Sequence, residues 1–386
     1  AGVSQGLPVN DTDGGKGTST DPYLISTKEQ LNNAKYDLRG CYKLTSNIDL
    51  QNDEWIPVGP HKYTAYCGVF DGDSYTISNL YINKPSEAYN GLFGAVNGGQ
   101  IKNLTINNVN VTGGNYTGGL AGYCEGSTVI QNCTIESPGS VDGQSNYVGG
   151  LIGWVVNCTI SDCISDIDVN AHSGFAGGLI GKCEQTEITQ CYTTGDITNS
   201  SAYVGGLIGY LYTECDVEEC YATGDVNALS HAGGLIGYTN STGLDNSVSN
   251  CFSLGDVTST DTTYADVGGL IGSSRNTLIE NCYSIGSVTT HSTDDDIGGL
   301  VGRWDSITLN NSYYDGVASG YIPYREYDHG RLTTGMKHQV TFNNWNFTTV
   351  WDIDEGNSYP YLRSVTVPAG VSQGLPVNDT DGGKGT

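Results

Sequence analysis

The stretch Gly149-Gly150-Leu151-Ile152-Gly153 decides the fold, because it recurs along most of the chain. Identical copies are centred on Leu179, Leu207, Leu235 and Leu270, and Gly-Leu-hydrophobic-Gly variants on Leu92, Leu120 and Leu300. The steps between successive leucines are 28, 31, 28, 28, 28, 35 and 30 residues. A period of this size is typical of stacked units that cannot bury their apolar face alone. The sequence therefore predicts a solenoid.

Two further phrases complete the repeating unit. One, an apolar residue, two polar residues and Cys, occurs at 130–133, 160–163, 188–191, 217–220, 248–251 and 279–282; the other, Gly-Asp and Ile or Val, occurs at 195–197, 224–226 and 255–257, with Gly286-Ser287-Val288 as a variant. Each phrase has the length of a strand, and the residues between phrases favour turns. We therefore expect rungs of three short strands that pair in parallel at about 4.8 Å. A β-sandwich would not repeat one phrase at such constant spacing.

The Gly-Leu-hydrophobic-Gly phrase resembles the GLUG motif, which occurs in surface proteins of bacteria and archaea. Further segments resemble the opening and closing parts of such domains: 21–31, 42–50, 55–59, 70–72 and 351–362. The resemblance covers about residues 16–364. It implies an all-β fold, a right-handed parallel β-helix with rungs of about 28–31 residues and short helical caps.

The chain is expected to form one elongated domain over residues 21–364. Its parts are an N-terminal cap with irregular rungs at 21–90, regular GLUG rungs at 91–318 and a C-terminal cap at 319–364. Caps are expected because the open edge of a solenoid recruits other strands.

Each cap is expected to contain a short helix. Ser26 and Glu29 form a capping box for a helix that runs through about Lys35, and residues 333–338 suggest a second helix. The aromatic cluster that follows is expected to cover the last rung, with a sugar-binding platform as the alternative; it consists of Phe342, Trp345, Phe347 and Trp351.

The two ends of the chain share one sequence, since residues 1–18 recur without change at 369–386. We interpret 1–20 as a linker and 365–386 as a linker and the start of the next copy. A tandem array of near-identical units explains this repeat, and engineered termini are the alternative. No secretion signal is recognisable, so we expect a mature chain or a part of a longer one.

Charge and hydropathy exclude several classes of protein. The formal net charge is −26, from 16 Lys and Arg against 42 Asp and Glu. Nucleic acid as a partner requires a basic footprint, and docking on an anionic membrane requires basic clusters. No stretch is long and apolar enough for membrane insertion.

Twelve cysteines in a chain with one Met suggest an oxidising compartment, and hence an extracellular or cell-surface location. Neighbouring rungs are close enough for disulfides. The expected pairs are Cys133–Cys163, Cys191–Cys220, Cys251–Cys282, Cys124–Cys158, Cys183–Cys215 and Cys41–Cys67. A ladder of buried free thiols is the alternative. No Cys or His spacing typical of zinc occurs.

Asparagine and aspartate supply further candidate sites. Sequons for N-glycosylation begin at Asn10, Asn103, Asn110, Asn115, Asn132, Asn157, Asn199, Asn240, Asn310, Asn346 and Asn378. Asp11, Asp13 and Asp21 loosely resemble a calcium loop, although the distal Glu of an EF-hand is lacking. A polar linker is the alternative, and no other cofactor is expected.

No catalytic site is expected. Asp196, Asp225 and Asp256 form a column that a polysaccharide hydrolase or lyase on a β-helix could use, with about 5–9.5 Å between acid and base. They belong to a repeated turn phrase, however, whereas catalytic residues should be exceptions to a repeat. No HExxH, Ser/His/Asp motif or phosphate loop occurs.

The sequence thus predicts a non-enzymatic structural unit of an extracellular filament, stalk or sheath, joined head to tail with identical copies. One alternative is an adhesin stalk that binds a glycan or a host protein. The other is a polysaccharide hydrolase or lyase on a β-helix, which would show a groove with carboxylates that break the repeat.

Overall fold

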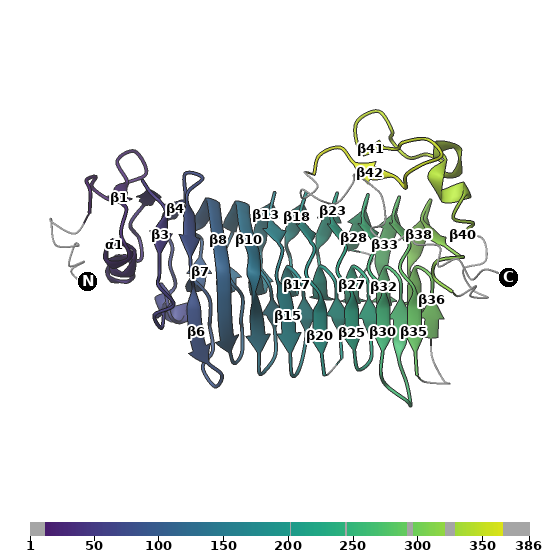
Figure 1. Cartoon of the computed structure of the whole chain (residues 1–386), viewed down its shortest axis with the longest axis horizontal. Coiled ribbons are helices and arrows are strands. Elements are labelled where there is room, and N and C mark those ends of the chain that lie inside the picture. The colour runs from purple at the N-terminus through teal and green to yellow at the C-terminus, as the bar shows by residue number, and fades with distance from the viewer. Residues whose placement is uncertain (1–11, 201, 244, 292–295, 321–328, 366–386) are drawn as a thin grey trace.

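Short strands stack in parallel into a long column in the computed structural model of this chain (Figure 1). The structure describes residues 12–200, 202–243, 245–291, 296–320 and 329–365. The column has about nine turns of about 29 residues. Paired residues lie one repeat apart, as Ile152 and Ile180 do. The parallel β-helix predicted from the sequence is confirmed.

The turns up to about residue 143 are irregular, whereas regular rungs were expected from residue 91. Their strands are β1 (Tyr23–Ile25), β2 (Tyr42–Leu44), β3 (Ile48–Asp49), β4 (Val69–Asp71), β5 (Thr76–Ser78), β6 (Tyr81–Lys84), β8 (Gln100–Gly113) and β10 (Thr128–Gly143). β8 and β10 pair in parallel along most of their length. They run through positions at which later rungs are divided into separate strands.

Each later rung consists of five short strands rather than the three expected, and these form five stacks. The first stack contains β7 (Phe93–Asn97), β9 (Ala121–Glu125), β12 (Ile152–Val156), β17 (Ile180–Glu184), β22 (Ile208–Leu211), β27 (Ile236–Asn240), β32 (Ile271–Arg275) and β37 (Val301–Asp305). The second contains β11 (Val148–Gly149), β16 (Ala176–Gly177), β21 (Val204–Gly205), β26 (Ala232–Gly233), β31 (Asp266–Gly268) and β36 (Asp296–Gly298).

The other three stacks continue β10 along the column. The third contains β13 (Cys158–Ser161), β18 (Glu187–Thr189), β23 (Asp216–Glu218), β28 (Asn246–Ser249), β33 (Thr277–Glu280) and β38 (Thr308–Asn310). The fourth contains β14 (Ile164–Ser165), β19 (Tyr192–Thr193), β24 (Tyr221–Ala222), β29 (Phe252–Ser253), β34 (Tyr283–Ser284), β39 (Tyr313–Asp315) and β40 (Gly330–Arg331). The fifth contains β15 (Asp168–Ala171), β20 (Ile197–Asn199), β25 (Val226–Ala228), β30 (Val257–Ser259) and β35 (Val288–Thr290).

A residue in the left-handed conformation separates the third stack from the fourth. Asp162 has a φ of 55° between β13 and β14. The residue before Cys keeps nearly the same φ on the other rungs, with 51° at Asn132, 55° at Gln190, 52° at Glu219, 53° at Asn250 and 54° at Asn281. Asn and Asp tolerate this conformation better than most residues, which explains why Asn recurs before the cysteine.

The glycines of the repeated phrase are required by close approach of backbones. A Cβ added to Gly149 would lie 2.2 Å from the carbonyl oxygen of Ile152, and one added to Gly150 would lie 2.2 Å from that of Gly178 on the next rung. Leu151 and Ile152 are fully buried. The phrase therefore places two apolar side chains in the core at a bend that has no room for others.

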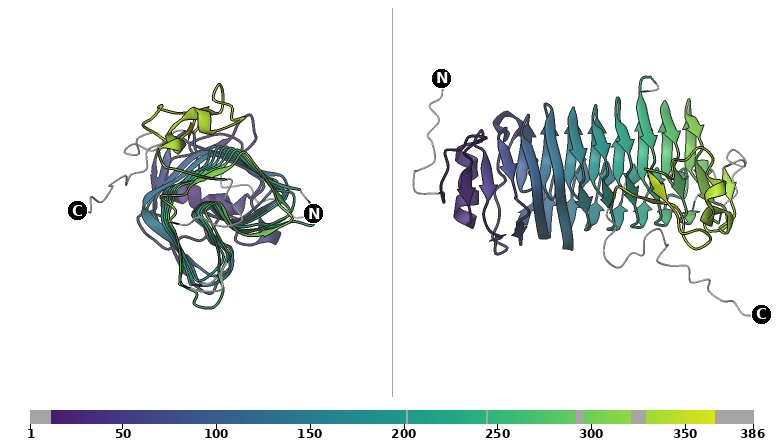
Figure 2. Two further views of the ribbon diagram at one scale, coloured as in Figure 1. Left: turned by 90° about the vertical axis from the view of Figure 1, so that its right-hand side faces the viewer. Right: turned by 90° about the horizontal axis from the view of Figure 1, so that it is seen from above.

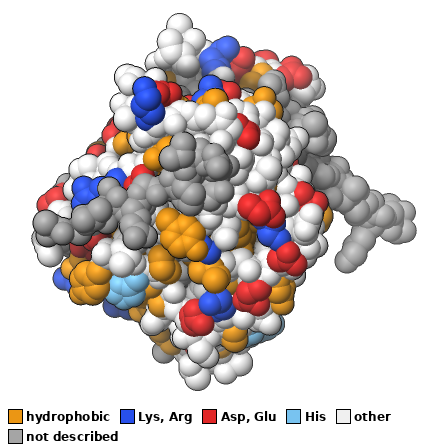
Figure 3. Space-filling view, turned by 90° about the vertical axis from the view of Figure 1, so that its left-hand side faces the viewer, with side chains coloured by type: hydrophobic (Ala, Val, Ile, Leu, Met, Phe, Trp, Pro, Cys, Tyr) orange, Lys and Arg blue, Asp and Glu red, His pale blue; other side chains and the backbone are white. Residues whose placement is uncertain are grey.

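The N-terminal cap contains α1 (Lys28–Asn33), followed by the 3₁₀ turn η1 (Ala34–Tyr36). Its capping box lies one residue later than expected, with Thr27 at N-cap and Gln30 at N3. The cause is the side chain of Gln30, whose Oε1 accepts from the backbone N–H of Thr27 at 3.1 Å. Acidic and basic side chains are interspersed on this end face (Figure 3). Within the expected linker, Asp13 N–H donates to the Leu24 carbonyl of β1 at 2.8 Å.

The C-terminal segment lies along a flank of the column and not across its end (Figures 1 and 2). It contains the 3₁₀ turns η3 (Gly335–Lys337) and η4 (Gln339–Thr341) and the antiparallel pair β41 (Trp351–Asp352) and β42 (Tyr361–Leu362). A further 3₁₀ turn, η2 (Lys62–Thr64), belongs to the early turns.

The aromatic cluster of this segment is buried against rings of the fourth stack. Those rings, here named the covered stack, belong to Tyr192, Tyr221, Phe252, Tyr283 and Tyr313. Trp351 is fully buried and Trp345 is 7% exposed. The expectation that the cluster covers the last rung is therefore corrected to a clasp along several rungs, and the alternative of a sugar-binding platform does not hold at these buried rings.

Candidate functional site

A second set of aromatic side chains runs along the column and is mostly half-exposed. We name it the open stack, and it has two rows. The first row precedes the second stack and consists of Tyr89, Tyr116, Tyr147, Phe175, Tyr203 and His231; Tyr264, two residues before β31, ends the row beside His231 at 6.1 Å, and Asp266 takes the position in register with His231. The second row is the third residue of strands in the first stack and consists of Tyr123, Trp154, Lys182, Tyr210, Tyr238, Ser273 and Arg303.

The backbone fixes the rings of the first row. Successive ring centroids from Tyr89 to His231 lie 4.6–5.5 Å apart, close to the spacing of the rungs. Tyr116, Tyr147 and Tyr203 have φ values of 58°, 65° and 67°. Bulky residues seldom adopt positive φ, and such strain persists only where the surroundings impose it. The rings are therefore held in place by the fold.

The side chains of the second row change from rings to polar groups along the column. Lys182 lies between rings, with its Nζ 4.6 Å from the centroid of Trp154 and 5.7 Å from that of Tyr210. Tyr210 and Tyr238 stack at 5.2 Å. The rings end at Ser273, which pairs with Tyr238 on one rung and with Arg303 on the next. A ring-sized side chain is replaced by a hydroxymethyl group at this point.

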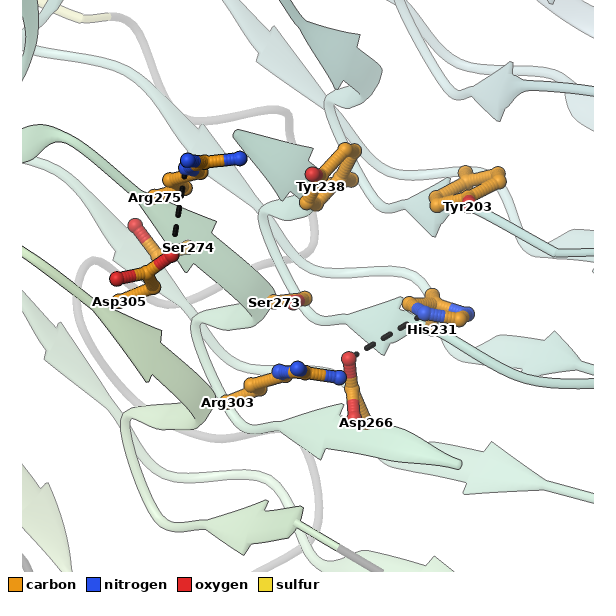
Figure 4. A pocket seen from close by; sticks show the side chains of 9 residues that line it. All are labelled: Tyr203, His231, Tyr238, Asp266, Ser273, Ser274, Arg275, Arg303 and Asp305. Atoms are coloured by element: carbon orange, nitrogen blue, oxygen red, sulfur yellow. Dashed lines mark ion pairs between the residues drawn. The ribbon is translucent and has the colours of Figure 1, made fainter. Parts of the chain in front are cut away.

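A pocket of about 270 Å³ lies where the rings end. Figure 4 shows its side chains arranged around Ser273, with Tyr238, Tyr203 and Arg275 above it and Arg303 and Asp266 below it. The lining residues are Tyr203, His231, Tyr238, Asp266, Ser273, Ser274, Arg275, Arg303 and Asp305. Small-molecule sites typically combine aromatic walls with a few convergent polar groups, and this pocket has that composition.

Asp266 is the most unusual group in the pocket. Its side chain is 1% exposed, and neither carboxylate oxygen has a hydrogen-bond partner of standard geometry among the described residues. Its Oδ2 lies 3.3 Å from Nε2 of His231. Burial raises the pKa of Asp266, an effect that His231 and the hydroxyls of Tyr264 and Ser273 oppose. A buried carboxylate whose neighbouring donors are poorly aligned is costly, so this position is not optimised for stability.

His231 connects Asp266 to a serine. Its Nδ1 lies 3.0 Å from Oγ of Ser230, so the imidazole bridges a hydroxyl and a carboxylate. Burial lowers the pKa of His231, Asp266 opposes this and Arg303 adds to it. Ser230 is 8% exposed and does not line the pocket, so its hydroxyl orients the imidazole and is not presented to a ligand.

Two arginines balance the acidic groups of the pocket. Arg303 donates to the hydroxyl of Tyr264, and its pKa is raised by electrostatic interaction with Tyr264 and, to a smaller extent, with Asp266. Nε of Arg275 lies 3.3 Å from Oδ2 of Asp305. The lining therefore contains two guanidinium groups and two carboxylates, in a chain whose formal net charge is −26.

The Asp column of the repeated turn phrase is structural. Oδ1 of Asp196 accepts from the backbone N–H of Asp225 at 2.9 Å, and Oδ1 of Asp225 accepts from that of Asp256 at 2.8 Å. Asp256 does the same for Ser287 at 2.8 Å. Each carboxylate thus binds the turn of the next rung, which agrees with the interpretation of these residues as turn formers.

All twelve cysteines are free thiols in the structure. Sγ of Cys183 and Sγ of Cys215 lie 3.2 Å apart. The six cysteines of the repeated apolar-polar-polar-Cys phrase, from Cys133 to Cys282, follow one another rung by rung within the core. Burial raises the pKa of Cys133, Cys191 and Cys251, which keeps them protonated. Ten of the twelve thiols are buried, and both the six disulfides and the thiol ladder stay predictions.

The sequon asparagines lie in different surroundings. Asn110, Asn132, Asn157, Asn310 and Asn346 are exposed, and Asn103, Asn115 and Asn240 are half-buried. Asn199 is 3% exposed and its Nδ2 donates to the Gly174 carbonyl at 3.2 Å, so a glycan has no room there and this candidate is corrected. Asn10 and Asn378 lie outside the described residues. Glycosylation of the others stays a prediction.

The expected calcium ligands are not assembled in the part of the chain that the structure describes. Oδ1 of Asp13 accepts from Gln30 at 2.9 Å, whereas Asp21 pairs with Lys16 at 3.5 Å. Asp11 lies outside the described residues. Across residues 12–365, apart from the gaps given above, no group of three or more His, Cys, Asp or Glu side chains could hold a metal ion.

Sequence reasoning missed the pocket, although one signal was present. The step from Leu235 to Leu270 is 35 residues and is the longest in the repeat. The additional residues of this rung include the turn that bears Tyr264, just before Asp266. His231 and Asp266 come from adjacent rungs, so no local motif joins them. A search for residues that interrupt a column, such as Ser273 in the second row, would have found the site.

Comparisons with known proteins agree on the motif and the fold. The family model "The GLUG motif" matches residues 144–170, 200–227 and 263–289. Halomucin from Haloquadratum walsbyi is 36% identical over 172 residues, which are 41% of this chain and 2% of halomucin. A protein from Evansella cellulosilytica, named as a Gly-rich membrane protein, is 32% identical over 139 residues, 32% of this chain and 15% of that protein. The chain therefore spans a small part of either relative.

A solved structure extends the likeness to nearly the whole chain. The crystal structure of a Bacteroides ovatus protein that bears the name of an immunoglobulin A1 protease matches with a TM-score of 0.52 and 20% identity, over 92% of this chain and 96% of that one. At this identity the likeness shows the fold alone. In the described ranges, no helix is long and apolar enough to cross a membrane. This chain is a parallel β-solenoid that carries the GLUG motif.

Proposed function

We propose that this chain is a non-enzymatic, stiff segment of a cell-surface protein, joined head to tail with identical copies into a filament, stalk or sheath. The observation that carries the proposal is the continuous parallel ladder, in which every stack pairs rung by rung along the column. Such a ladder has a high density of backbone hydrogen bonds along its axis, so it resists bending and stretching.

Three further observations support a surface role. The relatives at 36% and 32% identity are named halomucin and a Gly-rich membrane protein. The eighteen residues at 1–18 and 369–386 are identical, as in a tandem array. The first turn is covered by α1, and the end face presents mixed charges (Figure 3), which blunts strand addition at that edge. Copies would therefore be joined through the chain between them and not by open strand edges.

Electron microscopy of the native material tests this proposal. About nine turns at about 4.8 Å give about 43 Å, and the N-terminal cap extends this, so the expected axial repeat is near 50 Å. Continuous filaments or sheets with that repeat would support a structural polymer. Isolated short rods in native material would contradict it. Non-reducing gel analysis of the same material would show whether cysteine cross-links add to its strength.

The polysaccharide hydrolase alternative has one observation in its favour, because Asp266 is a buried carboxylate at a position that holds Tyr203 and His231 on the preceding rungs, although Asp296 occupies it on the next. The second carboxylate of the pocket, Asp305, is paired with Arg275, whereas glycoside hydrolysis needs two carboxyl groups with separate roles. We therefore expect no release of reducing ends from polysaccharides, and no difference between the wild type and Asp266→Asn. Turnover that Asp266→Asn abolishes would replace the structural proposal with an enzymatic one.

A further inference from the structure

The second row of the open stack contains a slot one ring thick. Tyr210 and Tyr238 stack on adjacent rungs at 5.2 Å, and the next position holds Ser273 instead of a ring. Arg303 follows on the rung after that. Tyr238 and Arg303 are therefore two rungs, or about 9.6 Å, apart along the column. A flat ligand ring of ordinary thickness fits between them in the place of the missing side chain.

The size of the pocket restricts the ligand. Its volume of about 270 Å³ lies just below the range of about 300–1,000 Å³ that is typical of small-molecule sites. One six-membered ring with its substituents fits such a volume, whereas a larger ligand would extend out along the open stack. The half-exposed rings of Tyr203 and Tyr238 would then contact further units of an extended chain.

The polar groups of the pocket match the rim of a sugar ring. A pyranose has an apolar C–H face that stacks on an aromatic ring, and hydroxyls around its edge. Asp266 is 1% exposed, its Oδ2 lies 3.3 Å from Nε2 of His231, and neither oxygen has a hydrogen-bond partner of standard geometry among the described residues. The carboxylate can therefore accept hydrogen bonds from sugar hydroxyls. His231 and Ser273 line the same cavity and offer further hydrogen bonds. Unsatisfied buried acceptors favour a ligand that brings donors.

Charge selects a neutral sugar over an acidic one. The two arginines of the lining are balanced by Asp266 and Asp305, so the pocket supplies no surplus positive charge. The chain as a whole carries a formal net charge of −26, which repels an anionic polymer on approach.

We propose that the pocket around Ser273 binds one neutral pyranose residue of a glycan, with the sugar ring stacked on Tyr238 in place of the missing ring of the second row and its hydroxyls bound to Asp266. This binding function goes beyond the structural role and does not depend on it. A stalk that binds no sugar, or a sugar-binding column that forms no filament, would each be detected by its own experiment.

Calorimetric titration of the full chain with a defined panel tests the proposal. The probes are cello-, laminari-, manno- and galacto-oligosaccharides of four to six residues, with oligogalacturonate as the acidic counterpart. We expect binding of at least one neutral probe, little change in affinity between low and high salt, and weaker or no binding of oligogalacturonate. If no neutral probe binds the wild type, or if only the acidic probe binds, the proposal is wrong.

Three variants locate the binding site. Ser273→Tyr fills the slot with a ring like those of Tyr210 and Tyr238 and should abolish binding while the chain stays folded. Asp266→Asn should weaken binding about 10-fold or more, because a hydrogen bond to a charged acceptor is lost. Tyr238→Ala should weaken it to a similar extent through lost stacking.

Tyr116→Ala is the matched control, because Tyr116 belongs to the open stack but does not line the pocket. Its affinity should equal that of the wild type. Circular dichroism and thermal unfolding confirm that each variant is folded. If the folded Ser273→Tyr variant binds the sugar as tightly as the wild type, the site is not at this pocket and the proposal is overturned.

Discussion

The covered stack and the open stack have similar ring spacing but different roles. In the covered stack, Tyr192, Tyr221 and Phe252 follow one another at 4.7 Å, much as rings of the open stack do at 4.6–5.5 Å. Tyr283 in the covered stack is 0% exposed, whereas Tyr264 in the open stack is 37% exposed. The difference is the C-terminal segment, which lies over one stack and not over the other. A ladder of rings becomes core where chain folds over it and a contact surface where it stays accessible.

The largest expected effect on stability is that of Trp351→Ala, which removes a side chain that the C-terminal segment packs against the covered stack. Trp351 is fully buried, its centroid lies 6.0 Å from those of Phe252 and Tyr283, and its Nε1 donates to Asn250 at 3.3 Å. Trp351→Ala should lower the free energy of unfolding by about 3–5 kcal/mol, measured by urea denaturation. A loss below about 1 kcal/mol would mean that the clasp is not part of the cooperative core.

The matched substitution in the open stack should cost less. Tyr147 is half-buried and stacks on Tyr116 at 5.3 Å and on Phe175 at 5.5 Å. Tyr147→Ala removes these ring contacts but leaves no enclosed cavity, so the expected loss is about 1.5 kcal/mol. The same denaturation experiment measures it. Equal losses for Tyr147→Ala and Trp351→Ala would remove the distinction between the two stacks.

The sequence was sufficient to predict the column but not how its flanks are used. The copies of Gly-Gly-Leu-Ile-Gly specify both the rung length and the buried pair, because their glycines are fixed by backbones about 2.2 Å from any added Cβ. The division into five strands depends on left-handed residues such as Asp162, which many residue types can occupy. Because the sequence shows only three recurring phrases per rung, it predicted three strands where the structure has five.

The placement of the C-terminal segment could not be deduced from local patterns. The apolar cluster around Trp345 and Trp351 predicts that this segment packs against the column. It does not predict whether the segment packs against an end or a flank, because both offer apolar side chains. What decides between them is contact between distant residues, as when Tyr283 donates to the Pro360 carbonyl at 2.6 Å. The pocket was missed for the same reason, since Asp266 and His231 meet only when rungs stack.

Asp266 lies at the end of the open stack, and we expect its buried carboxyl group to lower the stability of the fold. Burial raises the pKa of Asp266 above its usual value of 3.8. The folded chain thus holds this proton more tightly than the unfolded chain, and wild-type stability falls as pH rises from about 3.8 through the raised pKa. Asp266→Asn removes that loss and should raise the free energy of unfolding by about 1 kcal/mol at pH 7, but not below pH 3.8.

The groups that face this carboxyl do not reverse the sign. They are His231, Tyr264, Ser273 and Arg303. The pKa of His231 is lowered by burial, so its own contribution is lost as pH falls below about 6.5, in the wild type and in the variant. The difference between the two proteins, measured by denaturation from pH 3 to pH 8, should therefore grow with pH. A variant less stable than the wild type at pH 7 would make Asp266 a structural residue.

The smallest expected effect on stability is that of Ser273→Tyr, which completes the second row of rings. Ser273→Tyr would place a ring on Tyr238 as Tyr238 is placed on Tyr210 at 5.2 Å, and it would fill the pocket of about 270 Å³. The expected gain is about 0.5 kcal/mol, partly offset by Asp266, which a larger neighbour would desolvate further. A gain in thermal stability together with the loss of sugar binding would show that the gap in the second row at Ser273 serves ligand binding. A loss of stability would instead mean that Ser273 is required by packing, and the open stack would end there for structural reasons alone.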